Sequence, residues 1–443
     1  MDKPETSLNI ALACDWLTET GGAEQVIKVL HDLFPDAPIY TSQYRHKVDD
    51  FYGSFLDVRT GYLNLLPSHL RRFIAPLRQG YFKHLNLDNY DLVISVTGCD
   101  AKYIKGKNHI CYCHVPTQYY WCKYNDYLKN PGFGPLNALA RFSLKMLTPR
   151  LRKNDLAAAK CPTKYLTISS YSKKQIKKYY KRESQILPPP VAVRYFSQPV
   201  ENDIIKAGKC QIEKSSNKYN KNGKKQIPKT EQKSYTLSTI VEKSPESVRF
   251  LWNNRGKYYL NYSRQVNWKN LDTLITATVE LGLPLVLVGD GPEHENLVKL
   301  AKKLEKERRE KELFSNSPRP NNSPRDLVLF LPTLPREDLK NLLKYARAFV
   351  FPSEEPFGIA PVEALASGCP VVALKAGGAL DYIKSGKNGL FYVKNTAGSL
   401  KYALKHFEKH PIKDKRKIKP SAKRFSEENF IKGIRNTIKG ISA

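Results

Sequence analysis

The chain has 443 residues, of which 41% are hydrophobic and 26% charged, so it is long enough to bury two hydrophobic cores. Lys and Arg outnumber Asp and Glu by 73 to 42, and the net charge of +31 favours nucleic acid or an anionic membrane surface as partner, although a lysine-rich proteome would give the same excess. The eight cysteines show no CxxC spacing and no apolar run approaches twenty residues, which argues against a disulfide framework, a zinc site, a signal peptide and a spanning helix. We therefore expect a cytoplasmic protein with reduced thiols.

The first predicted strand covers residues 8–14, and a turn containing Gly21 and Gly22 follows it and opens an amphipathic helix. This pattern is typical of the first βα unit of a doubly wound sheet, where paired glycines let a ligand approach the backbone. Half or more of such glycine pairs only turn the chain, so the pair by itself is weak evidence for a ligand site.

Two further strands are predicted at residues 90–96 and 108–113, and the second of them ends at His114. A histidine at the carboxyl end of a parallel strand lies where open α/β sheets bind their ligands. A structural histidine at a strand end explains the position equally well. Residues 161–169 are predicted to form another strand, and the prolines at 188–190 mark the end of the first domain.

Two segments of the chain have an unusual composition. Residues 141–182 are crowded with Lys and Arg, and Asp155 is the only acid among them, which predicts a positive face on the first domain. Residues 201–248 are rich in Lys, Ser, Asn and Gln with few aromatics, and such a segment cannot bury enough surface to fold alone. We expect a disordered insertion there, beside the linker between the domains.

The second half opens with a predicted strand at residues 257–261, and Arg264 and Lys269 lie in the loop that follows it. Two cations five residues apart in a strand-to-helix loop can converge on one diphosphate. In so basic a chain, solvated surface cations would explain a random pair as well.

The next predicted strand, residues 283–288, ends in a glycine turn that contains Gly289 and Gly291. A second polar insertion is expected at residues 306–325, and residues 328–331 continue the sheet. Pro332 stands directly after this strand.

Residues 351–378, FPSEEPFGIAPVEALASGCPVVALKAGG, are predicted to be a βαβ unit whose helix opens near residue 359. Gly358 at the helix start lets an anion approach the free backbone N–H groups there. Glu355 and Glu363 flank this phosphate seat at a spacing that suits hydroxyl recognition on either side of a diphosphate. Two isolated acids at this spacing would more often be solvated residues of an ordinary βαβ unit.

The segment EEPFGIAPVEALASGCPVVAL with its following glycine pair resembles the donor-binding signature of the GT4 retaining glycosyltransferases. Residues 109–121, HICYCHVPTQYYW, resemble a bacterial mannosyltransferase subgroup of that family, with Gln118 and Cys122 in place of its usual Arg and Asp. The resemblance implies the GT-B fold, an α/β architecture of two Rossmann-like doubly wound domains facing a cleft. The implied parts are an acceptor-side domain (1–190), a linker with the insertion (191–248), a donor-binding domain (249–418) and a helix returning to the first domain (419–443).

The resemblance also assigns roles to individual residues. It implies that Arg264 and Lys269 contact the leaving diphosphate, that Glu355 contacts a sugar hydroxyl, and that His114 faces the sugar from the first domain. The implied donor-binding residues are Gly21, Gly22, Gly291, Gly358, Ile359, Ala360 and Glu363, the last at the ribose.

The implied function is retaining transfer of a hexose, with mannose from GDP-mannose favoured, to a glycan or lipid-linked acceptor. No metal or other cofactor is expected, because the two cations take the place of a metal bound by a carboxylate pair. Peripheral contact with an anionic membrane at its inner face is a further expectation. The alternatives are a UDP-hexose donor, a nucleotide-binding scaffold without turnover, and a nucleic-acid-binding protein, which only the charge suggests.

Overall fold

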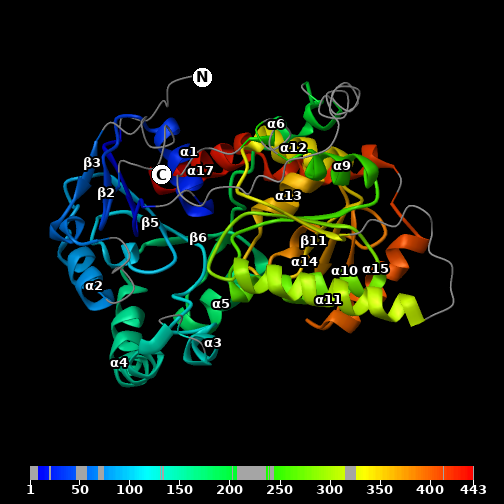
Figure 1. Ribbon diagram of the computed structural model, residues 1–443. Helices are drawn as coiled ribbons and strands as arrows, with labels where there is room; N and C mark the ends of the chain where they lie inside the picture. The colour runs from blue at the N-terminus through cyan, green and yellow to red at the C-terminus, as the bar shows by residue number, and fades with distance from the viewer. Residues whose placement is uncertain are drawn as a thin grey trace. The chain divides into compact units, whose positions relative to one another are not determined.

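The computed structural model divides the chain into two compact units, Met1–Val191 with Phe425–Ala443, and Ala192–Arg424. Each unit holds one parallel sheet with helices on both faces (Figure 1). The structure describes residues 8–18, 21–45, 57–67, 74–129, 131, 134–201, 203–206, 236–237, 239, 244–314, 326–412 and 414–442. Most of the insertion predicted at 201–248 lies outside the described residues.

The first sheet has seven parallel strands in the order β3-β2-β1-β4-β5-β6-β7. Its strands are β1 (Ile10–Cys14), β2 (Ile39–Thr41), β3 (Val58–Thr60), β4 (Leu92–Thr97), β5 (His109–Cys113), β6 (Lys164–Thr167) and β7 (Gln185–Ile186). Leu12 of β1 lies opposite Ile39 on one side and Ile94 on the other. The strand order therefore reverses between β1 and β4, and in doubly wound sheets ligands bind beyond such a reversal.

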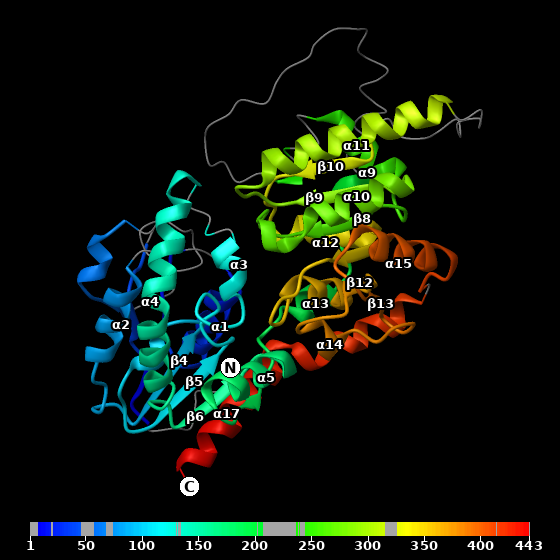
Figure 2. The same cartoon turned by 90° about the horizontal axis from the view of Figure 1, so that it is seen from below.

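Helices cover both faces of the first sheet, with α1 and α17 on one face and α2 and α4 on the other (Figure 2). The helices of this unit are α1 (Gly22–Leu33), α2 (Ala75–His84), α3 (Tyr124–Lys129), α4 (Asn137–Ala158), α5 (Ser170–Tyr180) and α17 (Glu427–Ser442). The return of the C-terminal helix to the first domain is confirmed, because α17 contacts α1 and the ring of Phe430 packs edge-on against Tyr112 at 5.6 Å.

The second sheet has six parallel strands in the order β10-β9-β8-β11-β12-β13. Its strands are β8 (Tyr259–Tyr262), β9 (Leu285–Val288), β10 (Val328–Leu331), β11 (Ala348–Phe351), β12 (Val371–Leu374) and β13 (Gly389–Tyr392). The order reverses between β8 and β11, which pair through Ala348 and Tyr259. The loops after β8 and β11, which carry the predicted cations and Glu355, therefore leave the same edge of the sheet side by side.

The helices of the second unit are α6 (Val193–Ser197), α9 (Pro245–Asn253), α10 (Leu271–Leu281), α11 (His294–Phe314), α12 (Arg336–Tyr345), α13 (Ile359–Ala366), α14 (Ala379–Tyr382), α15 (Ala397–Lys409) and α16 (Lys415–Ile418). The polar insertion predicted at 306–325 is helical in its first part, because residues up to Phe314 continue α11. Ion pairs between residues four positions apart stabilise this part of α11, such as Lys306 with Glu310 and Arg308 with Glu312. Residues 315–325 lie outside the described residues.

Candidate active site

An ion pair between Lys269 and Glu355 lies at the point where the second sheet reverses its order. The ammonium Nζ is 2.6 Å from the carboxylate Oε1, and the side chains are 14% and 16% exposed. Ser353 donates a hydrogen bond to the same Oε1 at 2.7 Å. The loops after β8 and β11 thus bring a cation and an acid that are 86 residues apart into one polar group with access to solvent.

Asn270 ties the two loops together next to this pair. Its backbone has the left-handed conformation, with φ of 52°, which Asn adopts more readily than most residues. Its side-chain amide donates to the carbonyl of Pro352 at 3.1 Å. Because Asn270 directly follows Lys269, this bond fixes the position from which the lysine reaches Glu355.

Gly358 stands at the N-terminus of α13 with φ of 93°, where any other residue would be strained. A Cβ atom here would lie 2.6 Å from Cζ of Phe351 and 2.9 Å from the hydroxyl of Tyr382. Gly358 supplies no side-chain cap, so backbone N–H groups in the first turn, at Ile359 and Ala360, are available to an anion. The phosphate seat stays a prediction, for which the structure shows a helix N-terminus without a side-chain cap.

The glycine pair at the end of the signature holds the backbone of Glu355. Gly378 donates its N–H to the carbonyl of Glu355 at 2.8 Å. Gly377 has φ of 60°, and a Cβ atom on it would lie 2.2 Å from the same carbonyl oxygen. A side chain at Gly377 would push the acid away from Lys269, which explains physically why the motif contains glycine at this position.

Glu363 lies in α13 and is only 7% exposed. Its Oε2 accepts a hydrogen bond from the hydroxyl of Tyr262 at 2.8 Å. Burial raises the pKa of Glu363 above its ordinary value. The two acids of the signature therefore have different environments, since Glu355 pairs with a cation and Glu363 is buried against a tyrosine. Tyr262 is a site residue that the sequence did not reveal.

The loop of Arg264 is pressed against the glycine turn after β9. Gln265 is fully buried, and it donates from its backbone to the carbonyl of Asp290 at 2.8 Å and from its side chain to the carbonyl of Gly289 at 2.7 Å. A Cβ atom on Gly291 would lie 2.3 Å from the carbonyl oxygen of Gln265. Gly291 thus permits close backbone contact between the two loops, while the side chain of Arg264 is exposed.

In the first unit, His114 follows β5 and lines a pocket of about 170 Å³ together with Asp15, Gly98 and Cys99. Its ring Nε2 is buried and has no hydrogen-bond partner among the described residues. Burial lowers the pKa of His114 to about 4, so the ring is neutral at physiological pH. A neutral imidazole with an unpaired nitrogen in a pocket can accept or donate one hydrogen bond to a ligand hydroxyl.

Asp15 organises the other wall of this pocket, a role that the sequence did not reveal. Its carboxylate accepts hydrogen bonds from the Thr97 hydroxyl and from four successive backbone N–H groups, at 2.7 to 3.0 Å: Gly98, Cys99, Asp100 and Ala101. Asp15 follows β1 and the turn follows β4, so the carboxylate links the two strands at the reversal. The sequence signal for this role was an acid directly after the first predicted strand.

Gly21 and Gly22 begin α1 as predicted, but a carboxylate already stands beside this helix N-terminus. Gly21 is the N-cap residue in an extended conformation, and a Cβ atom on it would lie 2.8 Å from Oε2 of Glu24. Glu24 is 8% exposed and places its negative charge where a phosphate would be favoured. Residues 19–20, which precede the pair, lie outside the described residues.

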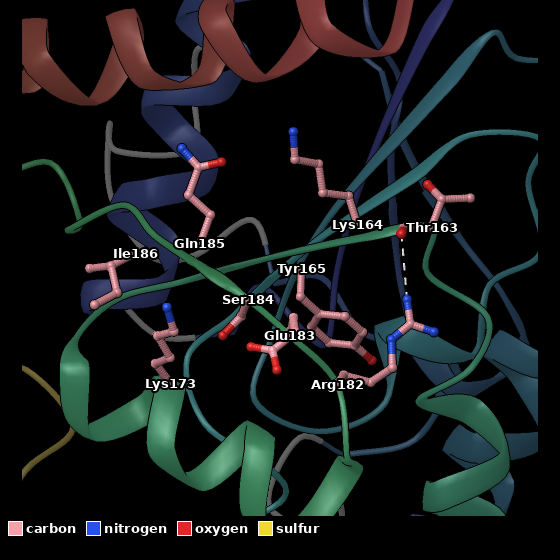
Figure 3. A pocket seen from close by; sticks show the side chains of 9 residues that line it. All are labelled: Thr163, Lys164, Tyr165, Lys173, Arg182, Glu183, Ser184, Gln185 and Ile186. Atoms are coloured by element: carbon pink, nitrogen blue, oxygen red, sulfur yellow. Dashed lines mark hydrogen bonds between the residues drawn. The ribbon is translucent and has the colours of Figure 1, made fainter.

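A larger pocket of the first unit, about 640 Å³, lies beside β6 and β7. Figure 3 shows the residues that line it: Thr163, Lys164, Tyr165, Lys173, Arg182, Glu183, Ser184, Gln185 and Ile186. The guanidinium of Arg182 is engaged, since it donates to the carbonyl of Pro162 at 2.7 Å and lies 5.3 Å from the ring centre of Tyr165. With Glu183 beside its cations, this pocket offers less to a phosphate than the N-terminus of α13 does.

Part of the chain is similar to known glycosyltransferases. Residues 321–425 match the family model described as "Glycosyl transferases group 1". The Bacillus subtilis protein described as "Uncharacterized glycosyltransferase YqgM" is 31% identical over 163 residues, which are 34% of this chain and 40% of that protein. The alpha-1,3/1,6-mannosyltransferase alg-2 of Neurospora crassa is 39% identical over 79 residues, 18% of this chain and 17% of that protein. The chain therefore spans well under half the length of these relatives.

Solved structures resemble the chain over nearly its full length. Anabaena Alr3699/HepE in complex with UDP has a TM-score of 0.61 at 16% identity, covering 97% of this chain and all of that one. WaaG, a glycosyltransferase involved in lipopolysaccharide biosynthesis, has a TM-score of 0.56 at 16% identity, with 97% and 100% coverage. At this identity the likeness shows the fold. The predictions of a GT4-like sequence and of the GT-B fold are confirmed.

Proposed function

We propose that this chain, a GT4-like glycosyltransferase of group 1 with the GT-B fold, transfers a hexose from a nucleotide sugar to a glycan or lipid-linked acceptor with retention of configuration. The observation that carries the proposal is the pairing of Lys269 with Glu355 at 2.6 Å beside the glycine-started N-terminus of α13. That arrangement supplies positive charge for a diphosphate and a carboxylate for sugar hydroxyls within one group of loops.

The diphosphate of the donor would bind at the first turn of α13, where the backbone N–H groups and the helix dipole favour an anion. Negative charge grows on the diphosphate as its bond to the sugar breaks. Lys269 and Arg264 both lie in the loop after β8, and their positive charges would stabilise the diphosphate in the transition state. The departing diphosphate oxygen would then take the proton of the acceptor hydroxyl, while the acceptor oxygen bonds to the anomeric carbon on the same face of the sugar.

When the donor binds, the Lys269 ammonium would exchange Glu355 for a phosphate of the donor. The pair with Glu355 is partly open to solvent, so a phosphate can compete for the ammonium group. Glu355 would then be free to accept hydrogen bonds from sugar hydroxyls, while Ser353, Gly377 and Gly378 keep its backbone and side chain in place. Because the two cations supply the positive charge, the reaction would need no metal.

The donor we favour is GDP-mannose, because residues 109–121 resemble the mannosyltransferase subgroup and place His114 in the pocket of the first unit. The second candidate is a UDP-hexose, because the base is not fixed by the resemblance: Pro332 follows β10 where the resembled family commonly has glycine near the nucleobase. Complexes of Alr3699/HepE with UDP and UDP-glucose share only the fold with this chain, so they do not decide between the two bases.

A lipid-linked acceptor would require the first unit to meet a membrane, and we propose peripheral contact with an anionic bilayer through the basic segment at residues 141–182. Asp155, the only acid in that segment, is fully buried and paired with Lys102 at 2.7 Å, so it does not offset the surface cations. In the part of the chain that the structure describes, no helix is long and apolar enough to cross a membrane.

The test is nucleotide release and sugar transfer from a panel of GDP- and UDP-sugars, with EDTA present and membrane lipid extract as acceptor. We expect turnover with GDP-mannose, and we expect Glu355→Gln to abolish it while the thermal unfolding temperature stays unchanged, because Glu355 lies in a ligand-facing loop. Turnover with UDP-hexoses alone would replace the donor assignment. Nucleotide binding without turnover for every sugar would support the scaffold alternative.

A further inference from the structure

Helix α4 carries two apolar faces, and the structure covers only one of them. Thr148, Leu151, Asp155 and Ala158 are its buried residues, three or four positions apart and all in its second half. Leu139 lies nine positions before Thr148, which is two and a half turns, so it points to the opposite side of the helix. The first half of α4, residues 137–147, has no buried side chain.

The uncovered face is formed by Leu139, Phe142 and Met146, which are 62%, 64% and 65% exposed. They lie three and four positions apart and so form one stripe. We call these three residues the α4 stripe. Arg150 and Lys153, both exposed, lie eleven positions after Leu139 and Phe142, close to three full turns, and therefore continue the same face. This face of the helix is therefore apolar in its first half, where the α4 stripe lies, and cationic in its second.

The second half of α4 is fixed to the unit by strong contacts. Lys102 pairs with Asp155 at 2.7 Å, Arg152 donates to the carbonyl of Tyr120 at 2.7 Å, and Asn154 reaches Gln79 of α2 at 3.5 Å. The exposed side chains of the first half include large apolar ones. An exposed apolar stripe of this size on a helix marks an interaction surface.

The charge around the stripe identifies the partner class. Residues 137–154 contain no Asp or Glu but carry Arg141, Lys145, Arg150, Arg152 and Lys153. A second copy of the chain, with a net charge of +31, would bring like charges together at this face. A helix with an apolar face and Lys or Arg around it suits the boundary of an anionic bilayer, where apolar side chains enter the acyl region and cations meet headgroups.

We propose that the α4 stripe inserts into the interface of an anionic membrane and that the cations around it hold the first unit there. This inference deepens the membrane contact of the proposed function, and it does not depend on which sugar is transferred. It assigns the membrane contact to one half-helix, whereas the basic residues of α5 would act only as general positive charge.

Co-sedimentation with vesicles tests the proposal, using pure phosphatidylcholine and equal parts of phosphatidylglycerol and phosphatidylcholine. The variant replaces Leu139, Phe142 and Met146 with Ser, and the matched control replaces Tyr402 and Val393, exposed apolar residues of the second unit, with Ser. We expect wild type and control to bind the anionic vesicles and the stripe variant to bind them at least tenfold more weakly. Equal binding of the variant and the control, or no binding of wild type, would overturn the proposal.

A second comparison separates the stripe from diffuse charge. Arg141→Gln with Lys145→Gln on α4 should weaken binding more than Lys173→Gln with Lys177→Gln on α5, although each pair removes two charges. An equal loss would show that net charge alone holds the protein, which would contradict insertion. Sedimentation equilibrium without vesicles gives a further decision, because stripe-dependent dimers would make a second copy the partner.

Nucleotide release from the soluble donor, measured without vesicles, distinguishes this inference from the proposed function. The stripe variant should keep wild-type release, since none of its changes lies in the loops after β8 and β11. If wild type shows no release but its vesicle binding depends on the stripe, the membrane inference stands and the transferase proposal fails. If release occurs and the stripe has no effect on vesicle binding, the reverse holds.

Discussion

Each unit contains a lysine paired with a carboxylate at nearly the same distance, and the two pairs differ in almost everything else. Lys102 and Asp155 in the first unit are 2.7 Å apart with side chains 1% and 0% exposed. Lys269 and Glu355 in the second unit are 2.6 Å apart with 14% and 16% exposed. Both pairs join segments far apart in the sequence, so separation alone does not tell a structural pair from a functional one.

The buried pair has a complete set of partners. Asp155 also accepts hydrogen bonds from Thr117 at 3.1 Å, Trp121 at 2.7 Å and Tyr180 at 2.8 Å. Thr117 and Trp121 belong to the loop that begins at His114, so the network holds that loop against α4 and α5. A buried charge needs such partners, and once it has them there is no room for a ligand to take their place.

The pair in the second unit is open to exchange. Glu355 has the Ser353 hydroxyl as a further donor, and the rest of its environment is a loop at the edge of the sheet. Because the pair is partly exposed, a phosphate can reach the Lys269 ammonium and take the place of the carboxylate. The two pairs therefore differ in the burial of the acid and in the number of its hydrogen bonds, and hardly in distance.

The largest effect should come from breaking the buried pair. Asp155→Asn leaves the Lys102 ammonium buried without a counter-charge, which costs about 3–5 kcal/mol of unfolding free energy. For a unit of this size that lowers the unfolding temperature by roughly 6–20 °C, measurable by circular dichroism. Glu355→Gln is the matched control, and its unfolding temperature should be near that of wild type.

The double variant Asp155→Leu with Lys102→Met adds a check on the cause. It removes both charges, so it should recover part of the stability that Asp155→Asn loses. If both single acid variants lowered the unfolding temperature equally, the distinction between the two pairs would be wrong.

The second largest effect should be a fall in kcat when either cation of the β8 loop is removed. Lys269→Ala and Arg264→Ala should each lower kcat by on the order of a hundredfold or more, equivalent to about 2.7 kcal/mol of barrier, because each removes a cation directed at developing charge. Donor KM should change less than kcat. Lys257→Ala, an exposed lysine at the other end of β8, is the control and should be neutral. Near-normal kcat in both site variants would contradict the diphosphate role.

The candidate site of the second unit could be predicted well because most of its residues lie close together in the sequence. The strand, the turn at Gly358, the helix and the glycine pair all lie within residues 351–378, and each residue type has a local physical reason. The cations of the β8 loop follow a strand whose apolar run was evident. Only the pairing of Lys269 with Glu355 could not be predicted without the structure, because two residues 86 positions apart show no common pattern in the sequence.

The first unit was predicted less completely, for three physical reasons. Strands β2, β3 and β7 have only three, three and two residues, too few to show a periodic apolar pattern. The roles of Asp15 and Asp155 depend on long-range contacts with backbone N–H groups and with Lys102. The sequence showed Asp155 as the sole acid of a basic segment, but it could not show that the acid is buried.

The smallest effect concerns Glu363, which shares features with both classes of acid. It is buried like Asp155, yet it lies in α13 beside the phosphate seat, and its hydrogen-bond donor is a tyrosine rather than a cation. We expect Glu363→Gln to raise the donor KM about fivefold, roughly 1 kcal/mol, with kcat nearly unchanged, since the amide keeps the shape but weakens hydrogen bonds from ribose hydroxyls. A hundredfold fall in kcat would instead place Glu363 with the catalytic residues.

Stability distinguishes Glu363 from Asp155 even without an activity assay. Burial raises the pKa of Glu363 in the folded state, so between its unfolded and folded pKa values the folded chain binds more protons. Its contribution to stability is therefore present below the unfolded pKa and is lost as pH rises through the folded pKa. Gln cannot ionise, so Glu363→Gln should be at least as stable as wild type at neutral pH, and its advantage should disappear near pH 4. A lower unfolding temperature for Glu363→Gln at neutral pH would show that the charged carboxylate supports the fold, as Asp155 does.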